Sequence, residues 1–191
     1  MTKKILTLWD DKDIRKEDER VLRKPATELS VPFDTEATAD IRTLMDAFLE
    51  RNDALGLAAP QIGISRKIII FRNKGFEEKT WTKAAGDYDV LINPRIVSTR
   101  GELVRGTEGC LSCPEIQVEI DRFPEIKVQA CDPKGKTINK RYVDFLARIV
   151  QHEIDHLEGI LILDRAENLY FPNKRRDFFE EIFQLKKDKS E

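Results

Sequence analysis

Histidine and cysteine are scarce in this sequence, which has two histidines and three cysteines in 191 residues. Because an odd cysteine count offers no disulfide framework, we expect free thiols and a reducing compartment, the cytoplasm. No apolar run approaches the ~20 residues of a membrane span, and the first residues lack the apolar segment of a secretory signal. The formal net charge of −2 gives no electrostatic reason to expect DNA or a membrane as a partner.

Hydrophobic periodicity predicts helices near both ends of the chain and strands between them. Apolar residues at helical spacing predict amphipathic helices over 35–52 and 172–187. Apolar runs and alternation predict strands at 67–71, 90–92, 117–120, 125–130, 140–143 and 160–163. Asn93-Pro94 is expected to end the second strand. A further helix, N-capped by Asp144 and ended by Gly159, is apolar on almost every side and is therefore predicted to be buried.

This order of elements favours an α+β fold. We expect mixed or antiparallel β-sheets around the central buried helix, with further helices at the N-terminal and C-terminal ends. The length suits one domain with an appendage. The expected organisation is a single catalytic domain over 1–171 and a C-terminal amphipathic helix over 172–191, either packed on that domain or appended to it.

Both histidines lie in one H-E-x-x-H window of the predicted buried helix, at His152 and His156. Side chains four apart on a helix point the same way, so the two imidazoles can face one metal ion with Glu153 beside it as a proton carrier. The alternative is a pair of ordinary buried histidines, which this spacing makes the weaker interpretation. Glu108 and Asp155 are candidates to accept hydrogen bonds from the ring N–H groups. A surface salt bridge is an equal alternative for Asp155.

A metal needs more than two histidine ligands, and upstream cysteines offer the next one. Cys110 would complete a site of two histidines and one thiolate, leaving a position open for water. Cys110 and Cys113 together would instead make a closed structural zinc site. The long interval between Cys113 and His152 counts against that second arrangement, because zinc fingers use ~12–15 residues there. Cys113 and Cys131 are then expected to be small buried hydrophobic residues.

Three separated segments resemble the signature motifs of the peptide deformylase family: GLAAPQIG at 56–63, EGCLS at 108–112 and QHEIDHLEG at 151–159. They occur in the family's order and with its usual spacing, and the resemblance spans roughly 20–165. The sequence departs from the family at Ala54, where glycine is usual, at Cys113, where an apolar residue is usual, and at Gln117, where many members have arginine. Residues 12–20 look like an insertion.

The resemblance implies hydrolysis of the N-formyl group from the N-terminal formylmethionine of nascent polypeptides, which releases formate. It implies that Cys110, His152 and His156 hold one divalent metal and that a water bound to this metal attacks the formyl carbon. Glu153 would then be the general base and later the general acid. The side chain of Gln61 and the backbone N–H of Leu111 would stabilise the charge that develops on the formyl oxygen.

The resemblance and the positions beside the motifs also predict the residues that bind the substrate: Leu55, Gly56, Gly109, Phe145, Arg148 and Ile149. Close backbone approach in the turn from Gly56 to Gly63 would admit formyl and exclude larger acyl groups, and Gly109 would keep Cys110 near the metal in the same way. The other four, Arg148 through its stem, would enclose the methionine side chain. Ordinary core packing is an equal alternative for these four.

The metal and the partners follow from the same reasoning. A thiolate with two imidazoles suits Fe²⁺, Zn²⁺, Co²⁺ or Ni²⁺ better than Mg²⁺. The resemblance implies Fe²⁺ in the cell, with Zn²⁺, Ni²⁺ or Co²⁺ in purified protein. It also raises a ribosome contact near the exit tunnel through basic residues of the C-terminal helix, which are Lys174, Arg175, Arg176, Lys186, Lys187 and Lys189. Acidic neighbours dilute that charge, so packing on the domain is the favoured alternative.

Two other functions stay open from the sequence alone. One is an endopeptidase of the H-E-x-x-H type, which would use a carboxylate or another ligand in place of Cys110. The other is an inactive deformylase-like binding protein, for which Ala54 and Gln117 are the only indications.

Overall fold

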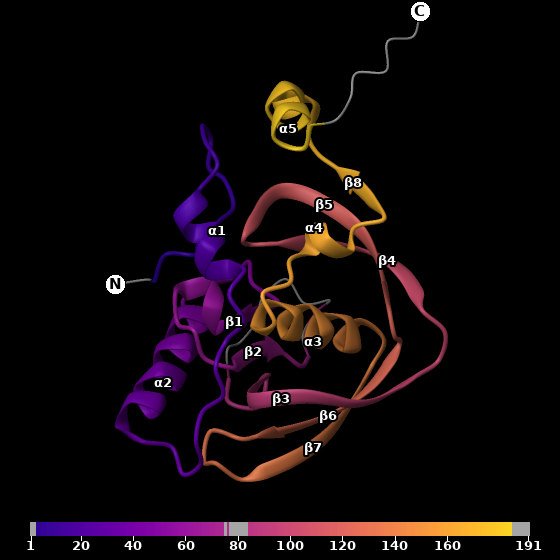
Figure 1. Ribbon diagram of the computed structural model, residues 1–191. Helices are drawn as coiled ribbons and strands as arrows, with labels where there is room; N and C mark the ends of the chain where they lie inside the picture. Colours follow the sequence, from indigo (N-terminus) through magenta and orange to yellow (C-terminus); the bar gives the residue numbers. More distant parts are fainter. Residues whose placement is uncertain (1–2, 75, 77–83, 185–191) are drawn as a thin grey trace, which may run out of the picture.

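The computed structural model describes residues 3–74, 76 and 84–184 (Figure 1). The helical elements are α1 (Lys16–Leu22), α2 (Thr35–Leu49), η1 (Ala59–Ile62), α3 (Asp144–Leu157), α4 (Ile162–Arg165), η2 (Asn173–Arg175) and α5 (Arg176–Ile182). The strands are β1 (Gly56–Ala58), β2 (Ile68–Arg72), β3 (Tyr88–Arg100), β4 (Val104–Cys110), β5 (Cys113–Arg122), β6 (Glu125–Cys131), β7 (Thr137–Val143) and β8 (Asn168–Tyr170). None of the helices in these described ranges is long and apolar enough to cross a bilayer.

The strands form two antiparallel sheets, one of five strands in the order β1-β2-β3-β6-β7 and one of three in the order β4-β5-β8. Helix α3 crosses the middle of the molecule between them (Figure 1). No side chain from Leu146 to Leu157 is classed as exposed, as expected for a helix with apolar residues on almost every side. The predicted α+β fold around a central buried helix is confirmed.

The prediction that Asn93-Pro94 ends a strand is wrong, because β3 continues through this pair. The pairing of β3 with β6 shifts register between Ile92 and Arg95, so Pro94, which has no N–H to donate, lies at an irregularity of the ladder. Asn93 adopts a φ of 50° there. Its side-chain amide pairs with both the N–H and the C=O of Leu29, at 2.9 and 2.8 Å, and its backbone N–H donates to Lys67 O at 2.8 Å.

Three other local predictions need correction. The predicted strand at 160–163 is instead an irregular pair of residues followed by the start of α4 at Ile162, where the carboxylate of Asp164 accepts a hydrogen bond from the N–H of Leu161 at 2.7 Å. Asp144 is the first residue of α3, with a φ of 51°, and Val143 occupies the N-cap position. The C-terminal helix predicted over 172–187 appears as η2 and α5, and residues 185–187 lie outside the described part of the chain.

The apolar side chains gather in three groups. One joins α2 to β1 and β2, and a second surrounds α3 on the five-stranded sheet. The third lies between β5, the N-terminal segment and α5, with Phe179 at 0% exposure. In this third group the ring of Trp9 meets Phe179 and Phe183 edge to face. The described part of the C-terminal helix therefore packs on the rest of the protein.

Candidate active site

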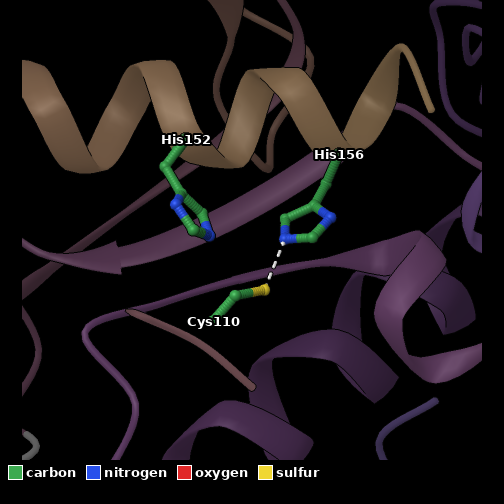
Figure 2. A group of neighbouring side chains, drawn as sticks. All are labelled: Cys110, His152 and His156. Atoms are coloured by element: carbon green, nitrogen blue, oxygen red, sulfur yellow. Dashed lines mark hydrogen bonds between the residues drawn. The ribbon is translucent and has the colours of Figure 1, made fainter. Parts of the chain in front are cut away.

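Helix α3 and the end of β4 bring three donor atoms together: the thiol of Cys110 and the imidazoles of His152 and His156. Their ligand atoms all lie within 4.8 Å of one another, and Sγ of Cys110 is 3.2 Å from Nε2 of His156. Figure 2 shows both rings projecting from consecutive turns of the helix toward the cysteine. A thiolate with two imidazoles at this spacing fits a divalent transition metal and leaves a coordination position open.

Cys113 lies directly opposite Cys110 in the β4–β5 pair, with 0% exposure, but it does not belong to the donor group. Its thiol hydrogen bond to Cys110 is the largest of the effects that hold the pKa of Cys110 well below the ordinary value. The same contact, together with burial, raises the pKa of the Cys113 thiol. One cysteine is therefore favoured as thiolate and the other as thiol, which suits Cys110 rather than Cys113 as a ligand.

Glu108 orients the first histidine. Its Oε2 lies 2.9 Å from Nδ1 of His152, which leaves Nε2 of that ring for the donor group. Burial opposes the charge on Glu108, but hydrogen bonds from His152 and Arg122 outweigh it and lower the pKa of Glu108 to about 2. Of the two predicted acceptors for the histidine N–H groups, Glu108 has this contact.

Asp155 instead belongs to a buried ion-pair network that the sequence did not reveal. Arg122 on β5 is 5% exposed and donates to both oxygens of Glu108, at 2.9 and 3.0 Å, and also to Asp155. Arg165 donates to both oxygens of Asp155, each at 2.6 Å, and shares Oδ2 with Arg122. Nδ1 of His156 is buried without a hydrogen-bond partner among the described residues. The expectation of Asp155 as its acceptor is wrong. The alternative of a salt bridge is confirmed with Arg165, whose side chain is 43% exposed, although Asp155 itself is buried.

Glu153 is 4% exposed, and its Oε2 has no hydrogen-bond partner in the described part of the chain. Burial raises the pKa of Glu153 to about 7. A carboxylate with so few partners is ready to exchange a proton with a group that enters the site. The backbone of Gly56 on β1 passes close against this carboxylate.

Gln61 reaches the donor group from η1, which follows β1 directly. Its Oε1 accepts a hydrogen bond from the N–H of Ala58 at 2.9 Å, which directs Nε2 toward Ser112 Oγ at 3.2 Å and Cys110 Sγ at 3.8 Å. Leu111 lies in the turn between β4 and β5. The N-terminal segment supports both positions, because the N–H of Leu6 donates to Gln61 O and the N–H of Leu8 donates to Ser112 O.

These groups meet in a cavity of about 640 Å³. Every residue predicted to bind substrate lines it, together with Gln61, Cys110, Leu111, His152 and Glu153. Leu55 and Phe145 are exposed at 39% and 48%, whereas Ile149 also belongs to the core around α3. Gly109 has ordinary space around it, since a Cβ there would lie 3.8 Å from Ile116 O.

Further residues of the cavity wall were missed by the sequence reasoning: Arg51, Asp53, Thr107, Pro114 and Glu115. Most come from loops and strand ends, where no periodicity marks a residue as facing a cavity, whereas Thr107 lies within β4. Of the departures from the family pattern, Ala54 lines the cavity and is 1% exposed. Gln117 is instead exposed on β5, where it pairs with Tyr170 of β8.

The fold and this site define a class: an α+β hydrolase whose H-E-x-x-H helix and facing cysteine suit a divalent metal. The sequence matches the family model described as polypeptide deformylase over residues 11–171. A peptide deformylase of Symbiobacterium thermophilum is 41% identical over 160 residues, covering 82% of this chain and 67% of the relative. One of Thermodesulfovibrio yellowstonii is 34% identical over 178 residues, covering 92% of this chain and 98% of the relative.

Solved structures of peptide deformylases superpose on this one. The peptide deformylase of Thermotoga maritima superposes with a TM-score of 0.69 and 32% identity, covering 88% of this chain and 99% of that one. The peptide deformylase of Synechococcus elongatus, in complex with actinonin, also superposes with a TM-score of 0.69. It is 32% identical, and the match covers 95% of this chain and 90% of that one. The chain belongs to the polypeptide deformylase family.

Proposed function

We propose that this protein hydrolyses the N-formyl group from the N-terminal formylmethionine of nascent polypeptides and releases formate. The observation that carries the proposal is the donor group Cys110, His152 and His156, in a chain of this family, next to a cavity that Cys110, His152 and Glu153 line. Because such substrates emerge from ribosomes, we place the protein in the cytoplasm.

Cys110, His152 and His156 would hold one divalent metal ion, and we propose Fe²⁺ in the cell. Zn²⁺, Ni²⁺ and Co²⁺ suit the same donors. When bound, such an ion supplies Lewis-acid chemistry for amide hydrolysis. Glu108 would fix the orientation of His152 for this purpose through the contact at Nδ1.

Glu153 would move the protons of the reaction. Its buried carboxylate accepts a proton from the attacking water and then donates it to the amine that leaves. The close backbone of Gly56 keeps this carboxylate in one place. The same group thus serves as base in the first half of the reaction and as acid in the second.

Gln61 and Leu111 would stabilise the negative charge that develops on the formyl oxygen. The Nε2 of Gln61 is directed by the bond between its Oε1 and the N–H of Ala58, so little reorientation is needed when substrate binds. The backbone N–H of Leu111 would donate from the turn between β4 and β5.

The cavity wall would select the substrate. Leu55, Phe145, Ile149 and the stem of Arg148 would contact the methionine side chain. The tight turn that starts at Gly56 would leave room for formyl while excluding larger acyl groups, and Gly109 would keep Cys110 near the metal. We assign these roles to a domain over 1–171, on which α5 packs.

The C-terminal helix also bears on the proposed ribosome contact. Arg175 forms ion pairs with Asp11 and Glu115, and Arg176 forms one with Glu180. Lys186, Lys187 and Lys189 lie outside the described residues. We therefore propose a ribosome contact only as an addition to the catalytic role, and co-sedimentation at several salt concentrations tests it.

The decisive experiment measures formate released from a formyl-Met-Ala-Ser peptide by anaerobically purified protein loaded with Fe²⁺ or Ni²⁺. We expect turnover that a chelator abolishes and added metal restores. Metal-loaded, folded protein that releases no formate contradicts the proposal and favours the inactive binding protein. Cleavage of an internal peptide bond in an unformylated peptide would favour the endopeptidase.

A further inference from the structure

Both ends of the described chain converge on one edge of the catalytic cavity, formed by Pro114 and Glu115 of β5. Trp9 from the N-terminal segment donates its indole N–H to Pro114 O at 3.1 Å. Arg175 from η2 donates to the carboxylate of Glu115 at 2.9 Å and to the backbone oxygen of Asp10 at 3.1 Å. This edge of the cavity is therefore held by contacts from outside the catalytic motifs.

The backbone at Glu115 needs such support. Its φ is 68°, a left-handed conformation that a residue with a side chain rarely adopts without surrounding contacts. The support is itself well packed, because the guanidinium of Arg175 lies 4.2 Å from the ring centre of Phe178 and its side chain is only 15% exposed. Arg175 thus joins the aromatic core under α5 to the wall of the cavity.

The edge is a partly exposed part of the cavity wall. Glu153 is 4% exposed at the inner end of the cavity, whereas the side chain of Glu115 is 30% exposed. A polypeptide whose formyl group reaches Glu153 must leave the cavity past its more exposed rim. The charge at Glu115 would then act on the residues that follow the formylmethionine.

We propose that Arg175 is a positioning residue that sets substrate specificity through Glu115. This inference rests on the proposed deformylation. By pairing with Glu115, Arg175 neutralises the rim and keeps the enzyme tolerant of either charge after the methionine. Removing the arginine leaves a carboxylate that favours basic residues there. Removing the carboxylate leaves the guanidinium with Asp11 as its remaining ion-pair partner, at 3.3 Å, so the shift toward acidic residues is the smaller of the two.

The test compares kcat/KM for formyl-Met peptides that carry lysine or glutamate at the next two positions. Arg175→Met, which keeps the packing stem, should raise the lysine-to-glutamate ratio about threefold, as expected for one screened charge. Glu115→Gln should lower the ratio about twofold for the same reason. In the double variant the lysine-to-glutamate ratio should return close to the wild-type value. All these shifts of the ratio should shrink in ~1 M salt, where screening is strong.

Arg176→Met is the matched control, because Arg176 pairs with Glu180 and Asn173, which do not line the cavity. A purely structural role for Arg175 would reduce turnover of both peptides equally, and that result overturns the inference. The inference is also overturned if Arg175→Met and Glu115→Gln shift the lysine-to-glutamate ratio in the same direction. If Arg175→Met does not fold, the direction in which Glu115→Gln shifts the ratio decides.

The same assay separates this inference from the proposed function. Wild-type protein that releases no formate from any peptide refutes the proposed function itself. Active wild-type protein with variants that do not change the lysine-to-glutamate ratio refutes only this inference.

Discussion

Gly56 and Glu153 lie so close together that the glycine has no room for a side chain. A Cβ built on Gly56 would lie 2.3 Å from Oε1 of Glu153 and 2.7 Å from its Cδ. The two residues belong to β1 and α3, which pack directly against each other. The strand backbone therefore forms one side of the pocket that holds the proposed base.

Gly56→Ala should displace the carboxylate of Glu153 while leaving the donor group of Cys110 and the histidines intact. Because a misplacement of about 1 Å can cost ~10²-fold in rate, we expect a loss of turnover of about that size. Formate release and metal content, measured on the same preparation, check this. Gly109→Ala should lose less, since its Cβ would meet only Ile116 O at 3.8 Å. Equal losses in the two variants would contradict the explanation.

Local sequence patterns predicted the helices and strands in which buried side chains recur at regular spacing. The apolar spacing of Ile41, Leu44 and Phe48 predicted α2, and all three side chains are buried. The strand prediction failed at Asn93 and Pro94, where β3 continues through an irregularity and the Asn93 side chain bonds the backbone of Leu29. These contacts join residues far apart in the sequence, so local propensity cannot reveal them.

Some residues of the candidate site could likewise be predicted from local patterns, and others could not. The H-E-x-x-H spacing and the cysteine motif predicted which donors could meet, because these are short patterns with a geometric meaning. The network of Arg122 with Glu108 and Asp155 could not be predicted, because each ion pair joins separate elements and no spacing rule links them. The roles of the donors in binding metal remain predictions.

Replacing Glu153 with glutamine tests the proposed base. The amide has the same shape but cannot accept the proton of an attacking water, so turnover should fall by about 10²- to 10⁴-fold. Bound metal should persist, because Cys110, His152 and His156 are unchanged. Single-turnover formate release and metal analysis provide the measurement. A glutamine variant with nearly wild-type turnover would refute the assignment.

The two neighbouring cysteines should differ in their effect on metal. Cys110→Ser should bind metal much more weakly, because a hydroxyl replaces the thiolate in the donor group. Cys113→Ala should keep its metal, since Cys113 lies outside that group. Competition with a chromogenic chelator measures both affinities. Metal loss in Cys113→Ala would instead support the closed site of two cysteines and two histidines.

Packing of the C-terminal helix can be measured through Phe179, which is 0% exposed. Phe179→Ala should lower the free energy of unfolding by about 3–5 kcal/mol, as is typical for a large aromatic removed from a core. Phe178→Ala should cost less, because Phe178 is only partly buried. Denaturant unfolding of both variants gives the comparison. A negligible effect of Phe179→Ala would mean that α5 is appended rather than packed.

The Arg122 network makes the strongest prediction for stability and metal affinity together. Arg122→Met would leave the carboxylates of Glu108 and Asp155 without their shared buried partner, which should destabilise the protein by about 3–5 kcal/mol. Glu108 would then hold His152 less firmly, so metal affinity should fall by about 10- to 100-fold.

Arg165→Met separates this effect from simple loss of an ion pair with Asp155. The Arg165 side chain is 43% exposed and does not contact Glu108, so its loss should cost at most about 1 kcal/mol and leave metal affinity unchanged. Denaturant unfolding and chelator competition on both variants give the measurement. If Arg122→Met weakens folding but binds metal as wild type does, then Glu108 does not need Arg122 to orient His152. The network would then stabilise the junction of β5 with α3 without tuning the site.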